Sequence, residues 1–90
     1  MSSQHIQALN AIVDEIFSVL EEVRKMFQSW DSSYHQPFIK EVMRLQWLRE
    51  SLHTLGYNEE FVEEVIRIAY HTVFTRDERL AYAGNWSIVV

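Results

Sequence analysis

Apolar residues recur at spacings of three and four along the first third of the chain, and this repeat constrains the fold more than any other feature. The repeat runs through Ile6, Leu9, Val13, Ile16, Leu20, Val23, Phe27 and Trp30. A repeat of about 3.5 residues, sustained over several heptads, is typical of a helix that lies along another helix at a shallow angle. We therefore expect a helix over about residues 4–30, roughly 40 Å long, as the longest element of a helical bundle.

Two further segments carry the apolar pattern of helices. Residues 37–55 begin with Pro37, which is favourable in a first helical turn, and they are followed by Gly56, which suits the left-handed residue after a helix. Asn58 is a capping residue for a third helix, and the acidic residues after it favour the positive end of the helix dipole. Apolar residues cover more than half of the circumference of this third helix, so we expect it to be the most buried of the three.

The chain after Phe74 allows two interpretations. Thr75 and Glu78 have the spacing of a capping box and predict a short fourth helix to Ala83, but the third helix could equally continue; Gly84 ends either version. Residues 85–90 predict an extended apolar tail, which we expect to dock on the bundle because burial of its large side chains is favourable. The predicted fold is an all-α antiparallel bundle of three or four helices with a long first helix, forming one domain over residues 1–90.

The composition excludes several classes of protein. The chain has 90 residues, a net charge of −5 and no cysteine. The lack of cysteine excludes a disulfide framework and a thiolate site, and the acidic charge disfavours direct binding of nucleic acid. There is no basic stretch followed by an apolar run at the start of the sequence, and no apolar run of about 20 residues. We therefore expect a cytoplasmic protein that does not bind or cross a membrane.

Acidic and basic residues occur in separate blocks. Residues 1–23 and 50–64 carry acids without a base, whereas residues 24–49 are rich in lysine and arginine. An antiparallel neighbour or a second copy could pair these blocks. The first helix also outreaches a second helix of about 28 Å, which leaves part of its apolar repeat uncovered, so we expect a homodimer.

Glutamates cluster at the start of the third helix, at Glu59, Glu60, Glu63 and Glu64. They form like-charge pairs four residues apart, an arrangement that is unfavourable unless a basic group lies nearby. One interpretation is a docking patch for a protein with a basic surface. The other is a solvated face whose first acids stabilise the helix dipole.

Aromatic residues form a second set of candidates. Trp30 and Tyr34 lie in the first connection, Trp47 lies beside the apolar stripe of the second helix, and Trp86 lies in the tail. Partly exposed tryptophan and tyrosine dominate the binding energy of many protein interfaces. These rings either contact a partner or cover the ends of the bundle.

Sequence signals for chemistry are few. Glu50 and His53 have the Glu-x-x-His spacing of carboxylate-bridged di-iron bundles, although they flank the apolar stripe of the second helix. The alternative is a histidine at a surface or helix end. No phosphate loop, dinucleotide fingerprint or zinc-ligand spacing occurs, and we expect no cofactor.

The stretch from Leu55 to Arg67, LGYNEEFVEEVIR, resembles the start of the last helix in the all-helical chorismate mutases, and Ala8–Ile16 is similar to their first helix. The resemblance implies a small dimeric enzyme in which cations grip a dicarboxylate. Candidates for these cations are Arg24, Lys40, Arg44 and Arg49. The arginine of the family's first helix corresponds to Asn10 here, and the expected late Gln or Glu falls near Asp77.

From these observations we expect a non-catalytic protein–protein interaction module, a small acidic regulatory, inhibitory or accessory subunit that docks on a partner with a basic surface. The alternatives are an enzyme of the chorismate-mutase type and a carboxylate–histidine metal-binding bundle. The predicted partner-binding residues are Glu59, Glu60, Glu63, Glu64, Trp30, Tyr34, Trp47 and Trp86.

Overall fold

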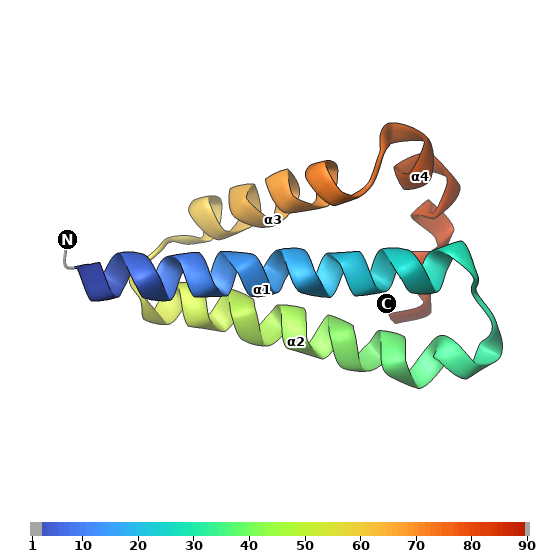
Figure 1. Ribbon diagram of the computed structural model, residues 1–90, viewed down its shortest axis with the longest axis horizontal. Coiled ribbons are helices and arrows are strands. Elements are labelled where there is room, and N and C mark those ends of the chain that lie inside the picture. The colour runs from blue at the N-terminus through green and yellow to red at the C-terminus, as the bar shows by residue number, and fades with distance from the viewer. Residues whose placement is uncertain (1–2, 90) are drawn as a thin grey trace.

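The computed structural model describes residues 3–89, which are almost entirely helical (Figure 1). The α-helices within this range are α1 (Ser3–Gln28), α2 (His35–Thr54), α3 (Glu59–Val73) and α4 (Arg76–Ala81). Two 3₁₀ helices complete it, η1 (Ser32–Tyr34) and η2 (Ala83–Val89). The all-α fold predicted from the sequence is confirmed, including its long first helix, and the version with a separate fourth helix is the one observed.

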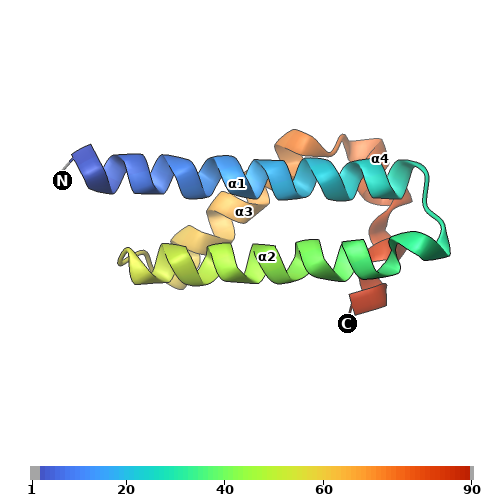
Figure 2. The ribbon, with the colours of Figure 1, turned by 60° about the horizontal axis from the view of Figure 1, so that its bottom comes forward.

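Helix α1 is the longest helix of the bundle (Figures 1 and 2). Helix α2 returns antiparallel along one side of α1, and α3 runs back along another side; α1 makes the most extensive helix contacts with both. Helices α2 and α3 contact each other less, because they diverge from the turn that joins them (Figure 1). Helix α4 and η2 close the end of the bundle where α1 connects to α2.

The core follows the apolar repeat of α1. This helix supplies Ile16, Val19, Leu20, Val23 and Phe27 to the buried residues. The other buried residues are Phe38, Leu52, Val62, Ala69 and Phe74. The first position of the repeat, Ile6, is 47% exposed, because α1 extends beyond its neighbours at this end (Figure 1).

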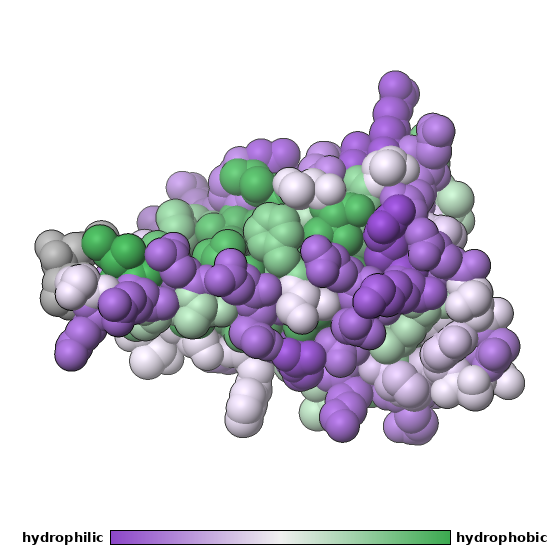
Figure 3. Space-filling view, viewed as in Figure 1, coloured by the Kyte–Doolittle hydropathy of each residue, from purple (hydrophilic) through white to green (hydrophobic). Residues whose placement is uncertain are grey.

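The prediction that the third helix is the most buried is wrong. Helix α3 buries only Val62 and Ala69, while Phe61 and Ile68 are exposed. The reason is geometric: α3 covers one side of α1 and diverges from α2, so only one stripe of its surface meets the core. Figure 3 shows one face of the molecule, on which apolar side chains gather along α1 and α3 and hydrophilic side chains surround them.

Local signals set the ends of the helices. The Asn58 side chain accepts a hydrogen bond from the Phe61 amide and caps α3, and Gly56 has a φ of 104°, which favours glycine. Thr75 and Glu78 form a complete capping box, which separates α4 from α3. Helix α2 begins earlier than expected, at His35, because η1 leads directly into it.

The C-terminal segment differs from its prediction. Residues 83–89 form the 3₁₀ helix η2 instead of an extended tail, and Val90 lies outside the described residues. Helix α4 ends at Ala81, before Gly84, so this glycine lies within η2. Docking of the segment is nevertheless observed at Trp86, whose ring packs against the core. The turn of η2 brings this ring inward, where the aromatic side chains of the bundle end lie.

None of the helices in residues 3–89 has both the length and the apolar character needed to span a membrane.

Candidate functional site

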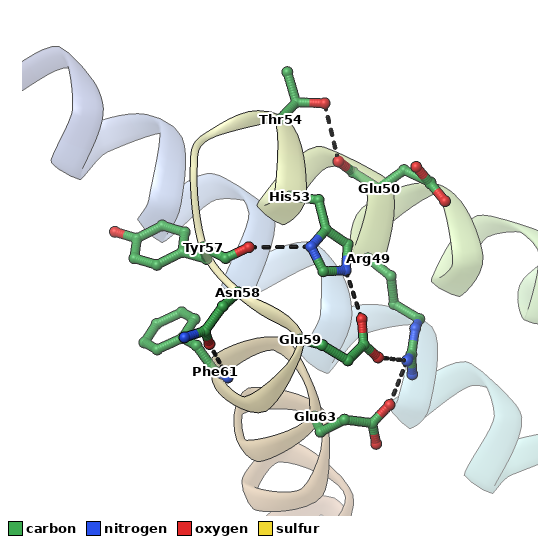
Figure 4. Close-up of polar contacts among 9 residues, drawn as sticks. All are labelled: Arg49, Glu50, His53, Thr54, Tyr57, Asn58, Glu59, Phe61 and Glu63. Carbon is green, nitrogen blue, oxygen red and sulfur yellow. Dashed lines mark hydrogen bonds and ion pairs between the residues drawn. The ribbon is translucent and has the colours of Figure 1, made fainter.

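The turn between α2 and α3 places two basic side chains of α2 against the acidic start of α3 (Figure 4). The Arg49 guanidinium donates to Glu59 at 2.7 Å and also to Glu63. The His53 ring contacts the Glu59 carboxylate through Nε2 at 2.8 Å and the Tyr57 carbonyl through Nδ1 at 3.0 Å. These contacts fix the position of the first turn of α3 relative to α2.

Hydrogen bonds from arginine lower the pKa of two carboxylates in this region. Hydrogen bonding from Arg49 is the main cause of a lowered pKa at Glu63, and hydrogen bonding from Arg67 lowers the pKa of Glu64. The side chains of Glu59, Glu63 and Glu64 remain 59%, 58% and 53% exposed. Exposed ion pairs contribute only about 0–1 kcal/mol each, so an incoming cation can compete for these carboxylates.

An exposed aromatic residue lies among these acids. The Phe61 ring is 37% exposed and stacks on Tyr57, with ring centroids 4.2 Å apart. The Tyr57 hydroxyl is in turn 3.1 Å from His5 Nε2 on α1, which anchors the stack to the bundle. One open hollow joins Phe61 to the glutamates on the surface. We call this surface the acidic corner, formed by Glu59, Glu60, Phe61, Glu63 and Glu64.

Three of the four predicted aromatic contact residues lie at the end of the bundle instead of projecting from it. Trp30 meets Phe38 edge to face with centroids 5.6 Å apart, and Trp86 meets Phe27 in the same way at 5.2 Å. Tyr34 packs at the edge of this group, 6.1 Å from Trp30. For these three side chains, the structure favours the interpretation in which they cover the end of the bundle.

Trp47 lies elsewhere. Its side chain is 80% exposed, and it lines an open hollow with Ile12 of α1 and Leu55. The exposed ring therefore remains a candidate for contact with a partner.

A groove of about 320 Å³ lies between α2 and α3, where the two helices diverge. Leu20, Leu45, Ile66, Tyr70 and Trp86 give it apolar walls, and Glu63 and Arg67 add charge to its lining. The buried Trp86 Nε1 has no hydrogen-bond partner within the described residues.

The predicted metal pair does not form a chelating arrangement. Both ring nitrogens of His53 are engaged by Tyr57 and Glu59, and the Glu50 carboxylate points away from His53 (Figure 4). Across residues 3–89, no group of three or more His, Asp or Glu side chains is placed to hold a metal ion.

The basic residues proposed for a dicarboxylate site occupy separate places. Arg24 pairs with Glu78 of α4 at 2.8 Å, whereas Arg44 pairs with Glu15 and Glu41. Arg49 belongs to the acidic corner contacts, and Lys40 lines a hollow on the outer side of α2. The contacts of the four cations therefore do not converge on one cavity.

Comparison with protein-family models, with curated proteins and with solved structures finds no match to this chain. The resemblance to chorismate mutases thus rests on residues 55–67 and 8–16 alone.

The sequence pattern indicated the glutamates of the acidic corner but not their basic neighbours on α2. Arg49 and His53 are four residues apart, so they lie on one face of α2, and a tight turn brings that face against the start of α3. This spacing is the signal that would have found them.

Proposed function

We propose that the protein is a non-catalytic interaction module that binds a partner protein with a basic surface through the acidic corner. The observation that carries the proposal is the exposed Phe61 ring, which stacks on Tyr57 and shares a hollow with the exposed glutamates. Many protein interfaces have an aromatic residue at their centre and charged residues at their rim.

The charges and the ring would have different roles in this interface. Exposed carboxylates attract a basic surface and orient it, which raises the association rate more than the final affinity. Desolvation of the Phe61 ring then supplies affinity. Because Arg49 and His53 hold the first turn of α3 in place, little ordering is needed on binding.

The test is capture of partners by the tagged protein from a lysate of its own host, at about 150 mM and about 500 mM salt. The variant carries Glu60→Lys with Glu64→Lys in the acidic corner. A matched control carries Asp14→Lys with Glu21→Lys, which makes the same change of charge on exposed positions of α1.

We expect a stoichiometric partner that the wild type and the control retain at the lower salt, and that the acidic-corner variant loses. Higher salt should weaken the capture by the wild type. Equal retention by both variants, or no stoichiometric partner at the lower salt, would contradict the proposal.

A further inference from the structure

A second surface lies on the side of α2 that faces away from the core. We call it the outer stripe, formed by Gln36, Lys40, Met43, Trp47, Glu50 and Thr54. Its members are all exposed and follow one another at alternating spacings of four and three, which is a heptad repeat. At its centre, Trp47 and Met43 are 80% and 65% exposed.

When two copies of the outer stripe face each other in antiparallel orientation, their charges are complementary. Around a centre at Leu45, Met43 and Trp47 are equidistant, and so are Lys40 and Glu50. In an antiparallel pair of such helices, Lys40 of each copy lies level with Glu50 of the other. A parallel pair in the same register would instead place like charges together, so the charges select the antiparallel arrangement.

Lys40 and Glu50 are available for such contacts. Neither side chain takes part in an ion pair within the described residues. Ion pairs are instead formed by Arg24, Arg44, Arg49 and Arg67. Ten residues of helix separate Lys40 from Glu50, about 15 Å, so they cannot pair within one chain.

Two open hollows border the outer stripe. One hollow is lined by Gln36, Pro37, Ile39, Lys40 and Met43, and another by Ile12, Trp47, Glu50, Ser51, Thr54 and Leu55. The two hollows lie on opposite sides of the centre of the stripe. Reversal of a second copy therefore brings the Trp47 side of each copy over the Met43 side of the other.

We propose that a second copy of this chain binds the outer stripe, and that the two α2 helices pack antiparallel about a two-fold axis near Leu45. The stripe is about 27 Å long, so the contact covers nearly the whole of α2. Apolar contact of Trp47 and Met43 supplies the affinity, and the two Lys40–Glu50 contacts set the orientation. This surface shares no residue with the acidic corner, so the dimer leaves that corner accessible on each copy.

The experiment is sedimentation equilibrium of the full chain over a concentration range up to about 100 µM. The wild type should be a dimer, and Trp47→Ser should be a monomer. Ile68→Ser is the matched control, because Ile68 is a large apolar residue exposed on α3, and it should leave the dimer intact. Circular dichroism establishes that each variant is folded.

Charge reversal tests the orientation. Lys40→Glu and Glu50→Lys should each raise the dimer dissociation constant by about tenfold or more, because each creates like-charge contacts at both ends of the interface. An equimolar mixture of the two variants should recover the dimer, since every contact in the mixed pair then joins opposite charges. If a variant failed to dimerise only because its fold is less stable, mixing it with the other variant would not restore the dimer.

Three results would overturn the proposal: a wild type that is monomeric over the whole range, a dimer that Ile68→Ser dissociates and Trp47→Ser does not, or single charge variants that fail to recover on mixing. None of these results would contradict the proposed function of the acidic corner, because that proposal is tested with substitutions of different residues.

Discussion

Trp86 offers the sharpest test of how the end of the bundle is held together. Its ring meets Phe27, Phe38, Tyr70 and Phe74 at centroid distances of 5.2 to 6.3 Å. These residues come from α1, α2 and α3 and from the C-cap of α3. Removal of the ring should therefore loosen the contact of every long helix with the C-terminal segment.

The expected size of the effect combines two contributions of opposite sign. Replacement of a core tryptophan by alanine costs about 3–5 kcal/mol, and less here because the Trp86 ring is only partly buried. The same change removes a buried N–H that has no partner in the described residues, and this contribution raises the free energy of unfolding by about 1 kcal/mol. We expect Trp86→Ala to lower the free energy of unfolding by about 2 kcal/mol.

Trp86→Phe separates the two contributions. Phenylalanine keeps most of the apolar contact, losing about 1 kcal/mol of burial, and it removes the unpaired N–H. The two changes nearly cancel, so Trp86→Phe should remain within about 1 kcal/mol of the wild type.

The assay is urea unfolding followed by far-ultraviolet circular dichroism. A chain of this length has a free energy of unfolding of about 5–13 kcal/mol, so both variants should show a complete transition. A loss below about 0.5 kcal/mol for Trp86→Ala would show that the ring does not hold the segment. If Trp86→Phe is as damaging as Trp86→Ala, the indole N–H has a partner and the reasoning about its burial is wrong.

Three other predictions concern single positions. Gly56→Ala should lower the free energy of unfolding by about 1 kcal/mol in the same assay, because the residue has a φ of 104° but its added methyl meets no atom. Thr75→Ala should also cost about 1 kcal/mol, since it removes the hydrogen bond to the Glu78 amide; Thr75→Ser, which keeps a hydroxyl, is the control. The Thr75 amide, and after it Arg24, lower the pKa of Glu78 from 4.5 to about 2. The contribution of Glu78 to stability is thus complete above pH 4.5 and is lost as the pH falls toward 2, so Glu78→Gln should flatten the acid limb of a stability profile measured by urea unfolding.

The proposed dimer and the proposed acidic site would act together. A two-fold dimer carries two copies of the acidic corner, and a partner with two basic surfaces would bind both at once. Such bivalent binding raises the apparent affinity only where the geometry permits both contacts. A dimer-breaking variant such as Trp47→Ser would then weaken capture of that partner without any change at the corner itself.

The sequence by itself determined where the helices lie. Three local signals act within one or two turns of the chain: the Asn58 cap, the Gly56 turn and the Thr75 capping box. Such local interactions do not depend on the rest of the fold, and this is why the three predicted helices agree with the structure. The sequence left open whether the third helix continues, and the structure shows a separate α4. The heptad repeat also identified most of the core residues of α1.

Only the tertiary structure decided what each helix faces. Only part of the surface of α3 meets the core, so Phe61 remains exposed, and the tight turn before this helix brings Arg49 to Glu63. Trp86 packs on the aromatic end of the bundle, and residues 83–89 form 3₁₀ turns where the sequence predicted an extended tail. These outcomes depend on contacts between residues distant in sequence, whose geometry is set by the packing of whole helices and not by any local pattern.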